Sequence, residues 1–267
     1  KLSDVNAERR TGYDWYGYWP EKIFEKYDEW LEKVQATSRY QGHEILNTMP
    51  SFYEQLRSSL TYPLAWGKAP IQDYGEWRKT ARQVLLDCIQ PAPPKVDFDM
   101  ELLAVEQREG YQAKKILFNV SGYSRVPAYL LVPEGVGPFP AVLLLHDHGA
   151  HFTIGKEKMV RPFGVDELVM EDADRWAEGC YEKQYVGDYL AANGYVVLAV
   201  DALFWGERGR KEGVSYDAQQ ALASNLQQMG MSWGALITWD DIRSAEFLAS
   251  LPEVNKDKVV YSGTENT

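Results

Sequence analysis

Two stretches of this sequence consist of five consecutive apolar residues, at 141–145 and at 196–200. A strand with such an uninterrupted run is buried on both faces, which is typical of a parallel sheet that carries helices on both sides. Residues 185–193, between the two runs, have a helical apolar spacing, and Gly194 follows, a residue that readily takes a left-handed conformation at a helix end. The sequence therefore predicts a strand–helix–strand unit of an α/β fold.

The same alternation continues on both sides of this unit. Short extended patterns at 102–107, 115–120 and 126–132 precede the first apolar run, and another follows at 258–262. A helix before this last strand is indicated by apolar residues at three- and four-residue spacing, namely Trp239, Ile242, Ala245, Leu248 and Leu251. We predict an α/β sheet that is mostly parallel and has an antiparallel N-terminal part.

Residues 1–95 have a different pattern, which is helical and rich in aromatic residues. One helix face is indicated by Ile23, Phe24, Tyr27, Trp30, Leu31 and Val34, and a second by Tyr74, Trp77, Ala81, Val84, Leu85 and Ile89. Residues 91–94 read Pro-Ala-Pro-Pro and end the second helix. We therefore predict a helical N-terminal region over 1–95 and an α/β domain over 96–267.

The charge balance argues against several classes of partner. With 28 basic and 39 acidic residues the formal charge is −11, the wrong sign for a phosphate backbone, so we expect no nucleic acid partner. No run of about eighteen apolar residues exists, so we expect no membrane-spanning helix. Cys88 and Cys180 are too few for a disulfide framework and are expected to be buried. The chain begins without methionine or an apolar leader, which leaves the localisation open.

From about Tyr123 onward the sequence resembles the α/β-hydrolase superfamily, specifically its dienelactone-hydrolase-like and acetyl-xylan-esterase-like members with a helical N-terminal extension. The resemblance is carried by residues 126–133 (VPAYLLVP), 138–149 (PFPAVLLLHDHG), 194–201 (GYVVLAVD), 206–209 (GERG) and 239–248 (WDDIRSAEFL). It implies a carboxylic ester hydrolase that needs no cofactor and acts on small, acetyl-type esters or acylated carbohydrates.

The chain departs from this family after its last strand. The family places a G-x-S-x-G turn there, whereas residues 263–267 read Gly-Thr-Glu-Asn-Thr, with Glu265 in the serine position. The strands that supply the acid and the histidine in the family are expected beyond residue 267. We therefore expect a truncated sheet whose last strand is an edge, and a homo-oligomer that covers this edge.

The resemblance also names residues for the site. Gly149 and Ala150, in the loop after the first apolar run, and Asn266, after the serine position, are the expected oxyanion donors. Ser262 and Glu265 are further candidates as nucleophile or base, although an ordinary strand-end or surface role is the alternative for each.

Three of the four histidines, His146, His148 and His151, lie within six residues. We expect His148 to be a general base that is oriented by Asp147 or Asp201. Two alternatives remain open. The histidines simply hydrogen-bond their own loop in a catalytically inert, truncated hydrolase fold, or they bind a metal ion in a metal-dependent hydrolase, although Ala150 replaces the aspartate of the metallo-β-lactamase motif that they resemble.

Overall fold

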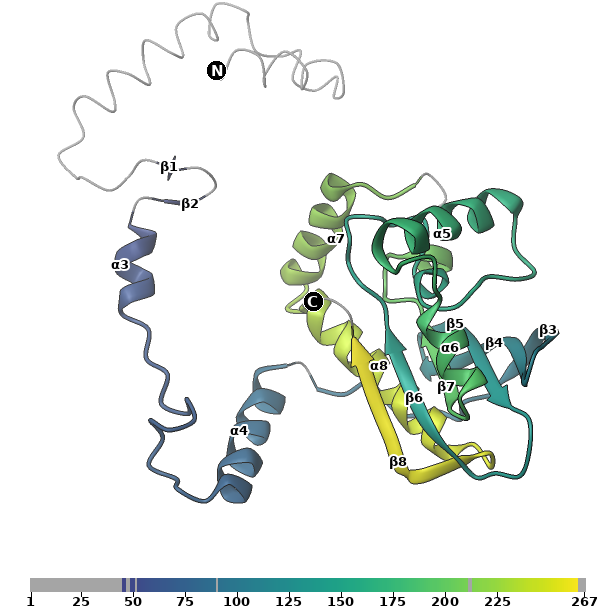
Figure 1. Cartoon of the computed structure of the whole chain (residues 1–267). Helices are drawn as coiled ribbons and strands as arrows, with labels where there is room; N and C mark the ends of the chain where they lie inside the picture. The colour runs from purple at the N-terminus through teal and green to yellow at the C-terminus, as the bar shows by residue number, and fades with distance from the viewer. Residues whose placement is uncertain (1–44, 47–48, 51, 90, 211–212, 264–267) are drawn as a thin grey trace, which may run out of the picture. The chain divides into compact units, whose positions relative to one another are not determined.

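The computed structural model describes residues 45–46, 49–50, 52–89, 91–210 and 213–263 (Figure 1). The chain forms two compact units, residues 1–77 and 78–267, and each is considered by itself. The predicted boundary at residue 95 falls inside the second unit, between helix α4 (Tyr74–Cys88), which begins in the first unit and ends in the second, and strand β3 (Glu101–Arg108). The assignment of domains on either side of residue 95 stays a prediction.

The first unit contains short elements and an aromatic cluster. Strands β1 (Ile45–Leu46) and β2 (Met49–Pro50) pair antiparallel, and helix α3 spans Tyr53–Ser58. Trp66 packs against Tyr74 and Trp77, with ring centroids 5.3 and 5.0 Å away. The helix predicted over 74–89 is confirmed as α4 (Tyr74–Cys88), whereas the helix predicted around 23–34 lies outside the described residues.

The second unit is built on a mixed sheet in which every strand predicted from sequence is confirmed. Its described strands follow the order β3-β4-β5-β7-β6-β8. Their bounds are β3 Glu101–Arg108, β4 Tyr111–Ser121, β5 Ser124–Pro133, β6 Phe139–Leu145, β7 Val196–Val200 and β8 Val254–Gly263. The antiparallel part is larger than predicted, since β5 pairs antiparallel with β7, and only β7–β6 and β6–β8 are parallel.

Helices connect and cover these strands. The crossover helix and the last helix predicted from sequence are confirmed as α6 and α8, while α5 and α7 were not predicted. Their bounds are α5 Glu167–Cys180, α6 Val186–Ala192, α7 Tyr216–Gln228 and α8 Trp233–Ser250, with the 3-10 turns η2 Lys156–Lys158 and η3 Gly206–Arg208. Asp166, Ser215 and Ser232 cap α5, α7 and α8, because each side chain accepts a backbone N–H of the first turn.

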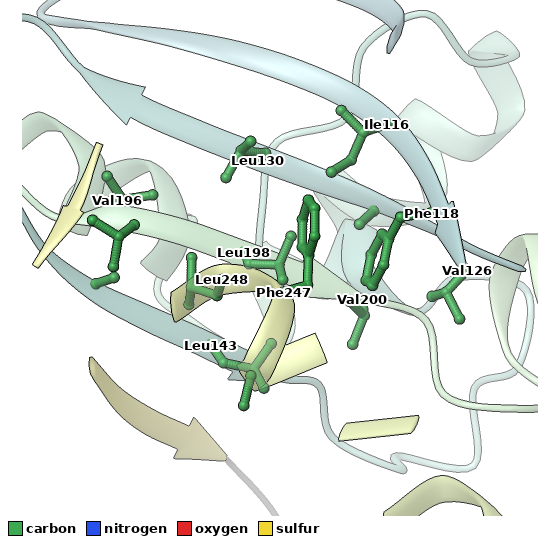
Figure 2. Close-up of a cluster of buried hydrophobic side chains, with 14 of the residues drawn as sticks. Ile116, Phe118, Val126, Leu130, Leu143, Val196, Leu198, Val200, Phe247 and Leu248 are labelled. Atoms are coloured by element: carbon green, nitrogen blue, oxygen red, sulfur yellow. The ribbon is translucent and has the colours of Figure 1, made fainter. Parts of the chain in front are cut away.

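The uninterrupted apolar runs of β6 and β7 supply both faces of the sheet. Leu143, Val196 and Leu198 point to one face, where Phe247 and Leu248 of α8 cover them (Figure 2). The alternate residues, among them Leu144, Val197 and Ala199, point to the other face, where α6 covers them. Since neither face is open to water, no position in these strands calls for a polar residue.

Strand β8 lies at the end of the sheet, beside β6 (Figure 1). Within the described part of the chain it has a partner on one side only, and Val260 and Tyr261 are exposed. The homo-oligomer that would cover this strand stays a prediction. Both cysteines are exposed rather than buried as expected, and no described helix is long and apolar enough to cross a membrane.

Candidate active site

Three parallel strands end at the same level, and this rim holds the candidate site. Leu145 of β6 is in register with Val200 of β7 and with Gly263 of β8. The loops that follow β6 and β7 therefore leave the sheet side by side, at the edge where α/β sheets place their ligands. A small cavity of about 40 Å³ opens there, with walls formed by His146, His148, Ala202, Trp205, Ile237 and Asp241.

His146 is a structural residue of this rim. Both ring nitrogens are occupied, since Nδ1 lies 2.8 Å from the carbonyl oxygen of Asp147 and Nε2 accepts the N–H of Ala202 at 3.1 Å. This pattern fixes a neutral ring that carries its proton on Nδ1. Burial lowers the pKa of His146 to about 4, which keeps the ring neutral across the physiological range.

The neutral state of His146 predicts a pH dependence of stability. The unfolded chain protonates this histidine near pH 6.5, but the folded chain only near its pKa of about 4. The contribution of His146 to the stability of the folded chain is therefore fully present above pH 6.5, and it is lost as the pH falls from 6.5 toward 4. Between pH 7 and pH 5 we expect the contribution of His146 to the free energy of unfolding to fall by about 2 kcal/mol.

Urea unfolding of the wild type and of His146→Asn at both pH values measures this contribution. The wild type should lose more stability than the variant over this interval. Equal losses in the two proteins would contradict the assignment of a buried, neutral His146.

His148 lines the cavity and also shapes its own loop. Its Nδ1 accepts the N–H of Ala150 at 3.0 Å, and its Nε2 lies 3.4 Å from Oε1 of Gln219. The N–H of Ala150, one of the expected oxyanion donors, is therefore occupied, and an oxyanion role for Ala150 would require this bond to break. Since Nδ1 accepts a hydrogen bond, the proton of a neutral ring sits on Nε2, which makes His148 a donor toward Gln219.

Gly149 permits the tight turn of this loop. Its φ is +51°, and a Cβ at this position would lie 2.4 Å from Cη2 of Trp176 and 2.6 Å from Oδ1 of Asp147. A side chain is therefore excluded both by the backbone conformation and by its neighbours. The expected oxyanion role of Gly149 stays a prediction.

Neither expected orienter of His148 contacts its ring. Asp147 accepts hydrogen bonds from Lys158, Trp176 and Tyr181, at 3.1, 3.2 and 2.6 Å. Burial raises the pKa of Asp147, but these donors, led by Tyr181, outweigh burial and hold it below its usual value. Asp147 therefore ties the loop after β6 to η2 and α5.

Asp201, which is fully buried after β7, has a similar role. Oδ1 accepts the backbone N–H of Lys156 at 2.7 Å, and Oδ2 accepts Nζ of Lys156 at 2.8 Å and the N–H of Glu207 at 3.1 Å. Gly155 and Gly206 leave space for this carboxylate, because a Cβ on either would lie within 3 Å of it. Asp201 therefore joins η2 and η3, and does not orient a histidine.

The three histidines do not form a metal site. His151 faces away from the other two, with Nε2 2.8 Å from Asp172 and its ring stacked on Trp176. In the described part of the chain, the one cluster of three potential ligand side chains is Glu157, Asp201 and Glu207. The ammonium group of Lys156 lies 2.7 to 2.8 Å from all three carboxylates, so it already supplies a cation there.

The remaining candidates are placed less favourably. Ser262 is paired with Leu144 and so lies on the opposite face of the sheet from Leu145 and the cavity. Glu265 and Asn266 lie outside the described residues.

Sequence reasoning missed three residues that build the site. Lys156 is fully buried, yet the surrounding Gly-Lys-Glu-Lys reads like a solvated turn. Trp205 packs between the rings of His146 and His148, at 5.6 and 5.1 Å, and stacks on Trp233. The position of Asp241 could have been found from the sequence, because it stands four residues after Ile237 and therefore lies on the same, otherwise apolar, face of the predicted helix.

A sheet whose parallel strands end at a common rim, with a cavity there, is an arrangement that α/β hydrolases share with other open α/β sheets. A model of the Abhydrolase family matches residues 37–266, and the chain belongs to this family. The resemblance proposed from sequence is thereby confirmed.

One relative and one solved structure of similar fold illustrate the match. Over 183 residues, which are 68% of this chain and 54% of the relative, it is 26% identical to "Putative hydrolase YtaP" of Bacillus subtilis (strain 168). The crystal structure of a putative acetyl xylan esterase from Bacteroides fragilis NCTC 9343 shares its fold, with a TM-score of 0.64 and 20% identity over 85% of this chain and 56% of the other. The chain thus spans about half the length of these relatives.

Proposed function

We propose that this chain hydrolyses small, acetyl-type carboxylic esters at the cavity on the rim of β6, β7 and β8. The observation that carries the proposal is the position of this cavity. It lies where three parallel strands end in register, and the end of β8 at Gly263 is paired with Leu145, which lines the cavity. In this fold the residues that follow the strand equivalent to β8 present a nucleophile.

The small volume of the cavity favours a substrate with a small acyl group. About 40 Å³ holds only a few non-hydrogen atoms. Each methylene that a pocket cannot accept costs about 1–3 kcal/mol of discrimination, so longer acyl chains are expected to react more slowly. An acylated carbohydrate is the natural substrate class that we propose, since its bulky alcohol would lie outside the cavity.

A metal-dependent reaction at the histidines is not favoured, because their ring nitrogens contact Asp147, Ala150, Ala202 and Asp172 rather than a common point. The catalytically inert fold is the alternative that an assay must decide. His148 is a suitable probe, since it lines the cavity and holds the N–H of Ala150.

Hydrolysis of p-nitrophenyl acetate, butyrate and octanoate by the purified chain tests the proposal. We expect turnover above buffer, resistant to chelator, with acetate preferred over octanoate by about tenfold or more. His148→Ala should lower the rate, because the loop and the cavity wall are both lost. The absence of turnover would support the inert fold, and turnover that chelator abolishes would support the metal-dependent alternative.

A further inference from the structure

Ile237 is the apolar side chain that α8 contributes to the wall of the cavity. Leu145 and Val200 line the same cavity, are paired in register, and belong to the sheet face that α8 covers. Ile237 therefore faces these two strand ends across the cavity. Since only about 40 Å³ is open between the two layers, a change of a few carbon atoms at position 237 is a large change for the cavity.

The other walls of the cavity are fixed by contacts that the structure shows. The ring of Trp205 stacks on Trp233 with centroids 5.6 Å apart, and its Nε1 donates to the carbonyl oxygen of His148 at 3.4 Å. Both ring nitrogens of His146 are occupied. Ile237 is aliphatic and packs against the aromatic cluster that contains Trp205, so it can be shortened without the loss of a hydrogen bond.

The lining of the cavity has a polar part and an apolar part. The polar part includes His148 of the loop after β6 and Asp241 of α8. The apolar part includes Leu145, Val200 and Ile237. An acyl group is divided in the same way, into a polar carbonyl end and an apolar chain, so the apolar part of the lining suits the chain.

We propose that Ile237 is the residue that sets the acyl specificity of this cavity, because it limits the space for the acyl chain to about two carbon atoms. The inference rests on the esterase function proposed above and names the residue that would enforce its preference for acetyl esters. It is supported by the place of Ile237 opposite the strand ends and by the fixed contacts of the other walls. A methylene group that a pocket cannot accept lowers kcat/KM by about 10- to 200-fold.

The test measures kcat/KM for p-nitrophenyl acetate and p-nitrophenyl butyrate with the wild type, Ile237→Val and Ile237→Ala. Valine lacks one carbon atom of isoleucine and alanine lacks three. We expect the butyrate-to-acetate ratio to rise about tenfold or more in Ile237→Ala and to take an intermediate value in Ile237→Val. Both esters are measured on one preparation of each variant, so a smaller folded fraction lowers both rates and cancels from the ratio.

Ile242→Ala is the matched control, because it makes the same change on the same helix. Ile242 is partly buried, as Ile237 is, but it lines a different groove beside β8 and not the cavity. Both alanine variants should unfold at a lower urea concentration than the wild type, since each loses three packed carbon atoms. Only Ile237→Ala should change the butyrate-to-acetate ratio.

The outcomes distinguish the two proposals. If the wild type hydrolyses acetate in preference to butyrate and Ile237→Ala keeps the same ratio, the inference is wrong and the esterase function stands. An equal rise of the ratio in Ile242→Ala would also overturn the inference, since its cause would be a general loosening of α8. So would a wild type that hydrolyses butyrate as fast as acetate. If the wild type hydrolyses neither ester, the function is wrong and the role of Ile237 is wrong with it.

Discussion

Replacing Lys156 with methionine is expected to lower the free energy of unfolding by about 3–5 kcal/mol. The side chain is fully buried, and its ammonium group lies 2.7 Å from Glu157 and Glu207 and 2.8 Å from Asp201. Burial lowers the pKa of Lys156, but these carboxylates, led by Asp201, outweigh burial and hold it well above its usual value. Methionine would fill a similar volume and leave two buried carboxylates without a cation.

Urea unfolding measures this effect, and pH identifies its cause. The difference between Lys156→Met and the wild type should be smaller at pH 5 than at pH 8, because protonation of the carboxyl groups removes the unpaired charge. Lys183→Met is the control, since Lys183 also pairs with a glutamate at 2.6 Å but is 73% exposed. An exposed pair of this kind contributes at most about 1 kcal/mol. Equal losses in the two variants would refute the buried charge network.

Replacing Gly149 with alanine is the second large effect, with an expected loss of about 2–5 kcal/mol. Part of the loss is the positive φ of +51°, which costs about 1–3 kcal/mol for a residue with a Cβ. The rest is overpacking, since the new methyl group would lie 2.4 Å from Trp176. Trp176 would have to move, and with it the hydrogen bond to Asp147 and the stacking on His151.

Gly194→Ala separates these two contributions. Gly194 has a φ of +88°, but nothing lies within 4 Å of the position where its Cβ would stand. This variant should therefore lose only the backbone share, and it should keep its ester hydrolysis. Gly149→Ala should lose activity as well as stability, because its loop forms the cavity wall. The crowding argument fails if the two variants unfold at the same urea concentration.

The sheet was predicted well because its central strands are recognisable from one property, an uninterrupted apolar run. Runs such as 141–145 and 196–200 are apolar on both faces, and in the structure each face is covered by a helix. Helices α5 and α7 were not predicted, and both are largely exposed. Glu167–Cys180 buries only Ala173 and Ala177, and Tyr216–Gln228 buries only Gln219 and Leu226. In α5 a helical apolar spacing at Val169, Ala173 and Trp176 was present in the sequence but was not recognised among its acidic residues.

The sequence indicated where a candidate site could lie, but it did not assign the contacts of its residues. The resemblance predicts a site in the loops after β6 and β7, around His148 and Asp201, and in the structure His148 lines a cavity at that rim. The roles depend on partners that are distant in the chain, such as Lys156 for Asp201 and Tyr181 for Asp147. No local spacing encodes these pairs, and for this reason Asp201 was expected to orient a histidine when it instead anchors η2 and η3.

The level ends of β6, β7 and β8 have an evolutionary consequence. Their alignment is fixed by backbone hydrogen bonds between Leu145, Val200 and Gly263, which do not depend on the identity of the side chains that follow. Mutation can therefore exchange the side chains at the rim of β6, β7 and β8 while the backbone of the rim is retained. Descendants of one ancestor are then free to diverge in chemistry without passing through an unfolded intermediate.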